Sequence, residues 1–113
     1  CPLYLLRKGA SELKEIKGDR VPIGFQDGLV NAYERHALQL EPGDRLYMSS
    51  DGFADQFGGP DGKKLKSSVL KRLLHSTGDR PMDEQGRALE AAFNDWRGEH
   101  DQVDDVLLIG LQL

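Results

Sequence analysis

The sequence is poor in cysteine and has no long apolar run. Its only cysteine is Cys1, so an intrachain disulfide and an all-cysteine metal site are both excluded. Such low cysteine usage is compatible with a reducing compartment, and we expect a cytoplasmic location. The longest strongly apolar stretch, residues 106–111, is interrupted by Gly110 and is far shorter than the roughly 20 residues of a membrane-spanning helix. We expect no membrane contact by this segment.

The sequence also lacks a strong excess of charge of either sign. It has 15 Lys and Arg against 19 Asp and Glu, a net charge of -4 and a pI near 5.3, which argues against binding to nucleic acid. Its 113 residues are enough for one small domain or for part of a larger one. Because the chain starts inside an apolar run without a methionine or a signal pattern, we expect it to be a piece of a longer domain.

The apolar pattern predicts strands near both ends of the chain. Residues 2–7 and 12–17 are expected to form one hairpin. A second hairpin is expected between 36–40 and 45–49, because Glu41-Pro42-Gly43-Asp44 between them has proline and glycine at the positions that a tight turn needs. Residues 106–113 are expected to close the sheet beside 45–49 and, being apolar on both faces, to be covered on both sides.

Two helices are predicted between these strands. Apolar residues recur at helical spacing over 65–74 and again over 82–96. Pro81 suits the beginning of the second helix and Gly98 suits its end. The order of elements predicts an α+β fold, in which an antiparallel β-sheet or sandwich is flanked by helices.

Acidic residues stand where one predicted strand ends and where the last one begins. Asp51 follows 45–49, and Asp104 and Asp105 precede 106–113. Antiparallel neighbours would bring these ends together, so that Asp51 and Asp104 project into one pocket of hard oxygen ligands suited to Mg²⁺ or Mn²⁺. The alternative is an ordinary Asp-Gly turn and a solvated acidic loop. On the residues alone, the two interpretations carry about equal weight.

Four motifs resemble, in the same order, the C-terminal half of the metal-dependent protein serine/threonine phosphatases. The similarity is greatest to the bacterial branch of the stage II sporulation phosphatase E and the sigma-factor-regulating phosphatases. It extends over residues 1–113 and implies the C-terminal part of a single phosphatase domain. The motifs are Pro22-Ile23-Gly24, then Leu40-Glu41-Pro42-Gly43-Asp44-Arg45-Leu46-Tyr47, Ser50-Asp51-Gly52-Phe53-Ala54-Asp55 and Asp104-Asp105-Val106.

The resemblance implies hydrolysis of phosphoserine or phosphothreonine with two Mn²⁺ or Mg²⁺ ions in the complete domain. It assigns Asp51 and Asp104 as metal ligands and gives Gly52 and Asp105 supporting roles. The resemblance also implies part of the α-β-β-α phosphatase fold. As substrate it implies a phosphorylated regulatory protein, such as an anti-sigma-factor antagonist.

Two departures from the family pattern limit this expectation. The Asp-x-x-Gly-His-Gly stretch that carries the bridging aspartate is absent, and Val106-Leu107 follows the Asp pair where the family has a hydroxyl residue. We therefore expect the chain alone to be inactive. The alternative function is a non-catalytic interaction module of a signalling regulator.

Other charged residues give weaker signals. The glycines before Lys63 and Lys64 do not have phosphate-loop spacing, so we expect a mobile loop whose lysines could steer an anionic substrate. Lys71 and Arg72 belong to a solvated helix face or dock an acidic partner. His100 is expected to cap a helix or face solvent. The exposed sheet of half a sandwich could also pair with a second copy, giving a homodimer.

Overall fold

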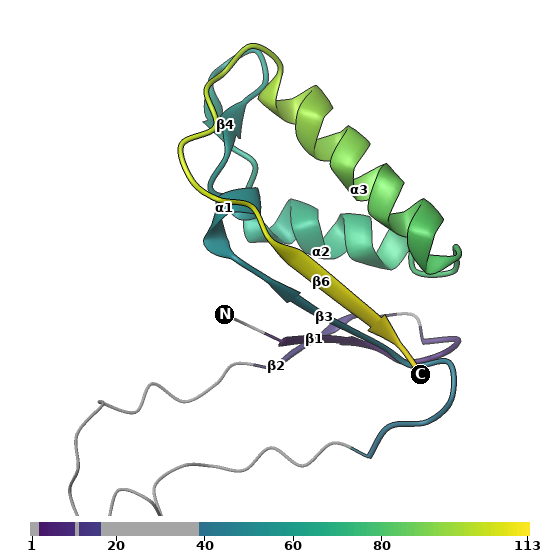
Figure 1. Cartoon of the computed structure of the whole chain (residues 1–113). Coiled ribbons are helices and arrows are strands. Elements are labelled where there is room, and N and C mark those ends of the chain that lie inside the picture. The colour runs from purple at the N-terminus through teal and green to yellow at the C-terminus, as the bar shows by residue number, and fades with distance from the viewer. Residues whose placement is uncertain (1–2, 11, 17–38) are drawn as a thin grey trace, which may run out of the picture.

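The computed structural model describes residues 3–10, 12–16 and 39–113. Cys1, His36 and the Pro22-Ile23-Gly24 motif lie outside the described residues. The helices and strands of the described part, in chain order (Figure 1), are β1 (Leu3–Leu6), β2 (Lys14–Ile16), β3 (Arg45–Ser49), α1 (Asp51–Ala54), β4 (Phe57–Gly58), β5 (Lys63–Lys64), α2 (Ser67–Ser76), α3 (Met82–Arg97) and β6 (Leu108–Gln112).

Four strands form one antiparallel sheet in the order β2-β1-β3-β6. This order confirms the first hairpin and the position of the closing strand beside β3. The predicted hairpin between 36–40 and 45–49 is wrong, because β1 and β6 occupy both edges of β3. Of its expected partner strand, only Gln39 and Leu40 are described, and neither lies in a strand.

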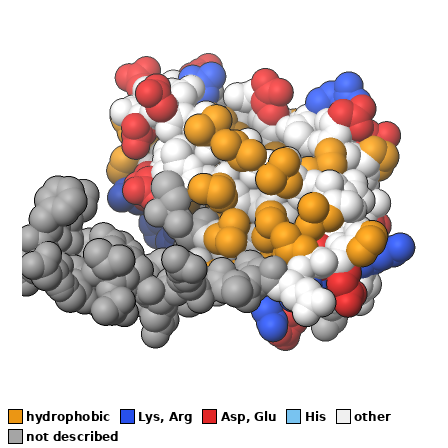
Figure 2. Space-filling view, turned by 60° about the horizontal axis from the view of Figure 1, so that its bottom comes forward, with side chains coloured by type: hydrophobic (Ala, Val, Ile, Leu, Met, Phe, Trp, Pro, Cys, Tyr) orange, Lys and Arg blue, Asp and Glu red, His pale blue; other side chains and the backbone are white. Residues whose placement is uncertain are grey.

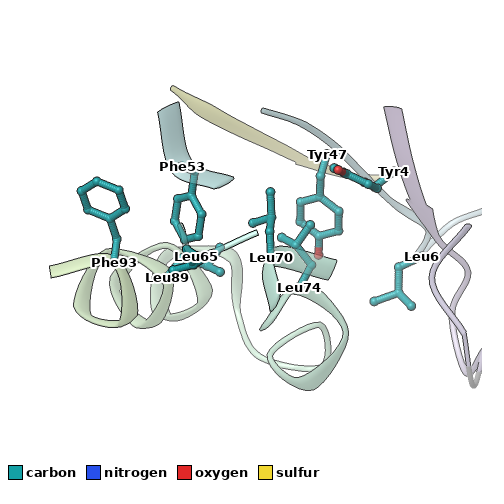
Figure 3. Close-up of a cluster of buried hydrophobic side chains, with 9 residues drawn as sticks. All are labelled: Tyr4, Leu6, Tyr47, Phe53, Leu65, Leu70, Leu74, Leu89 and Phe93. Carbon is teal, nitrogen blue, oxygen red and sulfur yellow. The ribbon is translucent and has the colours of Figure 1, made fainter. Parts of the chain in front are cut away.

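Helices α2 and α3 lie together over one face of this sheet (Figure 1). Strand residues that share a face alternate along the chain, and this face carries the buried Tyr4 and Tyr47, which are opposite each other in register. The tyrosines pack with Leu70 and Leu74 of α2 in a cluster that continues to α3 (Figure 3). The helices predicted from apolar spacing are confirmed, and their apolar stripes form the core.

A buried glutamine links the two helices to the sheet. Gln85 of α3 is 1% exposed, and its Oε1 accepts hydrogen bonds from the Tyr47 hydroxyl (2.9 Å) and from Arg45 Nη1 (3.0 Å). Its Nε2 donates to Leu74 O at 3.2 Å and to Thr77 Oγ1 at 3.0 Å. Each side-chain polar atom thus has partners, as burial requires. The apolar pattern gives no sign of this link.

The other face of the sheet carries exposed apolar side chains. Met48 and Ile109 are opposite each other in register and are 49% and 47% exposed, while Leu111 of β6 is 59% exposed. We call this the outer sheet face; it consists of Leu46, Met48, Leu107, Ile109, Leu111 and Leu113. Figure 2 shows the hydrophobic side chains gathered there. The prediction that the closing strand is covered on both sides is wrong, because Ile109 and Leu111 are exposed and the helices of the described residues lie on the opposite face.

The segment from Phe57 to Lys64 is a small hairpin rather than the expected mobile loop. Phe57 pairs with Lys64, and Gly58 pairs with Lys63. Gly58 lies so close to α3 that a Cβ atom there would be 1.9 Å from Trp96 O. The Trp96 indole donates back to Gln56 O at 2.9 Å. These contacts fix the hairpin against the end of α3.

Within the described residues, no helix is both long and apolar enough to cross a bilayer.

The turn before β3 is held by a buried carboxylate. Asp44 is 2% exposed and accepts hydrogen bonds from the Glu41 N–H (2.9 Å), from Arg7 Nη1 (2.7 Å) and from the Lys8 N–H (3.2 Å). The Glu41 N–H is the main cause of a lowered pKa for Asp44; burial acts in the opposite direction, and Arg7 and Lys8 reinforce the lowering. The charged form is therefore favoured in the folded chain.

We expect this carboxylate to make stability depend on acid pH. Because the folded pKa of Asp44 is lower than its unfolded value near 3.8, its contribution is complete above that value and is lost as the pH falls through the folded pKa. Asp44→Asn should therefore flatten the fall in the free energy of unfolding below about pH 4. Urea unfolding at several pH values in this acid range measures how steeply the free energy of unfolding falls. Asp83→Asn, which changes an exposed ion pair with Arg87, should keep the wild-type slope; equal slopes in all three proteins would contradict the assignment.

Candidate metal centre

The end of β3 and the approach to β6 are joined through Ser50. The last register pair of the two strands is Ser49 with Leu108. Beyond it, the Ser50 N–H donates to Leu107 O at 2.8 Å, and the Leu107 N–H donates to Ser50 Oγ at 2.9 Å. The Ser50 hydroxyl in turn donates to Asp105 O at 3.1 Å. One serine therefore holds the residues after β3 against the residues before β6.

Asp51 begins the short helix α1 directly after this serine. Its carbonyl oxygen accepts the Asp55 N–H at 2.9 Å, and its side chain is exposed. Next to it, Gly52 is buried against the backbone of Asp105. A Cβ atom at Gly52 would be 2.2 Å from Asp105 O, which is closer than any side chain permits. The absence of a side chain at Gly52 is what lets the two segments approach.

Asp104 and Asp105 are both exposed in the segment that leads to β6. Asp104 Oδ1 accepts the Asp105 N–H at 2.8 Å, and Asp104 O accepts Gln102 Nε2 at 3.0 Å. One carboxylate oxygen of Asp104 is therefore already a hydrogen-bond acceptor, while the carboxylate remains open to solvent. The structure brings the backbone of residues 50–52 next to that of residues 105–107, as the strand order predicted.

The charge of Asp51 also affects the pKa of a buried tyrosine in the sheet. Tyr4 of β1 is 1% exposed, and burial is the main cause of the raised pKa of its hydroxyl. The negative charges of Glu15 and Asp51 raise this pKa further, because they disfavour a phenolate beside them. Tyr4 therefore stays neutral and is not a candidate base.

The acidic residues of the described part do not form a complete metal site by themselves. Hard carboxylate oxygens are suitable donors for Mn²⁺ or Mg²⁺, and Asp51 and Asp104 are of this kind. However, within residues 3–10, 12–16 and 39–113 there is no group of three or more His, Cys, Asp or Glu side chains that could hold a metal ion. The ligand roles of Asp51 and Asp104 therefore stay predictions.

The two lysines considered for substrate steering lie on β5. Lys63 and Lys64 are both exposed. Lys64 Nζ is 3.7 Å from Asp55 Oδ1 and 5.9 Å from the centre of the Phe57 ring. Lys64 is therefore engaged, although weakly because the pair is exposed. Lys71 of α2, considered above for docking an acidic partner, is also paired, since its Nζ is 3.0 Å from Glu15 Oε2 of β2.

His100 lies near the β4–β5 hairpin, just after α3. Its N–H donates to Arg97 O at 2.9 Å, and its ring would be 3.5 Å from a Cβ at Gly62. His100 is exposed, which agrees with the expectation that it caps a helix or faces solvent.

Two residues that position the candidate site are missed by sequence reasoning. Ser50 enters it only as part of a motif, although a hydroxyl directly after a strand is a usable signal. Gln56, which is 1% exposed, donates from Nε2 to Asp101 O at 2.9 Å and so anchors the far end of the acidic segment. No sequence signal distinguishes this glutamine.

Similarity to a known family shows the class of this protein. A family model described as stage II sporulation protein E matches residues 1–113. The chain therefore belongs to the stage II sporulation protein E family. No curated protein sequence matches it.

A solved structure described as the SiaA-PP2C domain of Pseudomonas aeruginosa is similar to this chain. The two share 33% sequence identity with a TM-score of 0.82, and the match covers 99% of this chain and 42% of that chain. The predicted α+β class is confirmed, and the described residues form part of the phosphatase-domain fold. The chain spans less than half of the length of this relative.

Proposed function

We propose that this chain is the C-terminal part of a metal-dependent protein phosphatase that hydrolyses phosphoserine or phosphothreonine in a regulatory protein. The observation that carries the proposal is the clamp of Ser50 on Asp105 and Leu107, which holds the Asp51 and Asp104 segments at one end of the sheet. Membership of the stage II sporulation protein E family and the similarity to a PP2C domain support it.

In this proposal Asp51 and Asp104 hold Mn²⁺ or Mg²⁺, together with ligands from outside the described residues. When bound, the two ions would lower the pKa of a water molecule and offset charge on the phosphate oxygens. Gly52 permits the close approach of the two segments, and Ser50 fixes it. Asp105 supports the site through its backbone, which contacts both residues.

The proposed substrate is a phosphorylated regulatory protein such as an anti-sigma-factor antagonist, and the proposed location is the cytoplasm. Both follow from the family resemblance. Lys63, on the exposed hairpin, is proposed to steer the negatively charged substrate, while Lys64 is partly offset by Asp55.

The test is phosphate release from a phosphoserine protein by the complete parent protein and by this chain, with Mn²⁺ present. We expect turnover by the complete protein. We expect the chain alone to be inactive or nearly so, because its described residues supply too few grouped carboxylates. Turnover by the chain alone would overturn the second expectation. Inactivity of the complete protein at saturating Mn²⁺ would instead favour the interaction module.

We further propose that the isolated chain pairs with a second copy through the outer sheet face. This face gathers exposed apolar side chains from β3 and β6 (Figure 2), and apolar patches of this kind favour association. Among the described strands β6 is the last of the sheet order, so antiparallel pairing with a second copy along β6 would also satisfy its outer backbone edge.

Light scattering at rising concentration should therefore detect a dimer. The double variant Met48→Lys with Ile109→Lys should shift the chain to monomer, since it places two charges on the face. The matched control is Ser68→Lys with Ala91→Lys, at exposed positions of α2 and α3, which should still dimerise. A monomeric wild-type chain at high concentration would refute the proposed pairing.

A further inference from the structure

An open cavity of about 580 Å³ lies at the end of β3 opposite to Ser50. It is bordered by the turn after β1, by the beginning of β3 and by the connection from α2 to α3. Its volume is in the range typical of small-molecule sites, about 300 to 1,000 Å³. The proposed phosphatase chemistry makes no use of it.

The charged groups that line this cavity are mostly cationic. Arg7, Lys8 and Arg45 contribute positive charge, and Asp79 is the one carboxylate among the described lining residues. His75 also lines it. Arg7 is already paired with Asp44 at 2.7 Å, whereas Lys8 is exposed and lies over Gly43, with its Cδ 2.6 Å from where a Cβ would be.

Arg45 is the decisive residue because its charge is buried. It is 5% exposed, and its guanidinium donates to neutral oxygens: Gln85 Oε1 at 3.0 Å, the carbonyl of Arg80, and Gln112 Oε1 at 3.4 Å. Across the described part of the chain, the ion pairs do not include Arg45. Buried charges are normally matched by an opposite charge, and here the cavity is where such a charge can enter.

Three carbonyl groups at the end of α2 beside the cavity are hydrogen-bonded. A helix C-terminus repels anions through its unpaired carbonyls. Here Leu73 O accepts from Thr77 Oγ1 at 2.7 Å, Leu74 O accepts from Gln85 Nε2 at 3.2 Å, and His75 O accepts the Gly78 N–H at 3.2 Å. Because these carbonyls already accept hydrogen bonds, they are not unpaired groups that would repel an anion.

We propose that this cavity binds a phosphate group, with Arg45 as its buried anchor and Lys8 as its exposed cation. A planar guanidinium pairs well with phosphate oxygens. The ligand is either free phosphate or a small phosphomonoester, because the volume accommodates both. Such a site is distinct from the acidic strand ends, and its occupancy does not depend on phosphatase activity.

The test is a phosphate titration of the chain followed by amide chemical shifts, with a chelator present so that no divalent ion takes part. Inorganic phosphate and glycerol phosphate are the two probes. We expect saturable shifts at Gly9, Gly43 and Gly78, which line the cavity. Tighter binding of glycerol phosphate would identify a phosphomonoester as the ligand, and tighter binding of inorganic phosphate would identify free phosphate.

Variants separate binding from non-specific attraction. Lys8→Gln should weaken binding about threefold to fivefold, as expected for an exposed charge. Arg45→Lys should weaken it roughly tenfold or more, because the lysine loses the paired donors. Lys14→Gln removes an exposed charge from β2, outside the cavity lining, and should change nothing.

The proposal is overturned if the shifts do not saturate, or if all three variants bind alike. If Arg45→Lys fails to fold, Lys8→Gln decides alone, since Lys8 is exposed and its replacement leaves the core unchanged. Equal binding by Lys8→Gln and Lys14→Gln would then refute a phosphate site in this cavity.

Discussion

Replacing Gly52 by alanine should destabilise the chain by about 2 to 3 kcal/mol, the upper part of the range for overpacking a tight site. The new methyl group would be 2.2 Å from Asp105 O and 3.2 Å from Val106 Cγ2. The first of these neighbours is backbone, which cannot rotate away as a side chain can. The segments that follow β3 and precede β6 must therefore separate, and the hydrogen bonds of Ser50 should weaken with them.

Gly86→Ala is the matched control for this change. Gly86 lies inside α3, past its first turn, and is exposed. A methyl group at this position would have no atom within 4 Å apart from its own helix backbone and chain neighbours. Alanine there should stabilise the chain by about 0.5 to 1 kcal/mol, the difference in helix propensity between the two residues.

Chemical denaturation measures the change in the free energy of unfolding in both variants, and the two changes should have opposite signs. Amide hydrogen exchange at Leu107, whose N–H is bonded to Ser50 Oγ, should become faster in Gly52→Ala and not in Gly86→Ala. If Gly52→Ala were as stable as wild type with unchanged exchange at Leu107, the close contact would not be what joins the two segments.

The fold was largely predictable where local pattern determines structure. The stripes of α2 and α3 follow from helical spacing. The β1–β2 hairpin follows from an apolar run and a loosely alternating segment, with a turn-like stretch between them. The partner of β3 was less predictable. A proline and glycine turn at 41–44 indicates a reversal of the chain, but it does not say which segment then pairs with β3, and β1 and β6 take both of its edges.

Tertiary contacts explain the remaining differences. The apolar character of residues 106–111 suggested burial on both faces, yet an apolar pattern cannot show whether anything is present to cover it, and the outer sheet face is exposed. Gln85 and Gln56 act through hydrogen bonds to residues far away in sequence. For the candidate site, the sequence indicated which strand ends meet, but it did not indicate that Ser50 and Gly52 make their approach possible.

The largest functional effect is expected from the two carboxylates at these strand ends. Asp51→Asn and Asp104→Asn should each lower the proposed phosphatase activity of the complete protein on the order of 100-fold or more, the scale seen when one preorganised electrostatic contact is removed. An amide retains the shape of the side chain but lacks the charge that hard divalent ions prefer. Both variants should also lose the same Mn²⁺ site in a calorimetric titration, because the clamp at Ser50 puts their segments together.

Nearby carboxylates provide controls with the same change in charge. Asp55→Asn alters the residue at the end of α1, whose Oδ1 is 3.7 Å from Lys64 Nζ, and Asp101→Asn alters an exposed side chain in the segment that contains Asp104. Both should keep Mn²⁺ binding and activity close to wild type. If the effect came only from a general loss of negative charge, all four variants would lose binding and activity alike. Loss of activity in Asp51→Asn with full activity in Asp104→Asn would show that the two residues do not share a site, and it would reduce the candidate centre to a single ligand beside a solvated acidic loop.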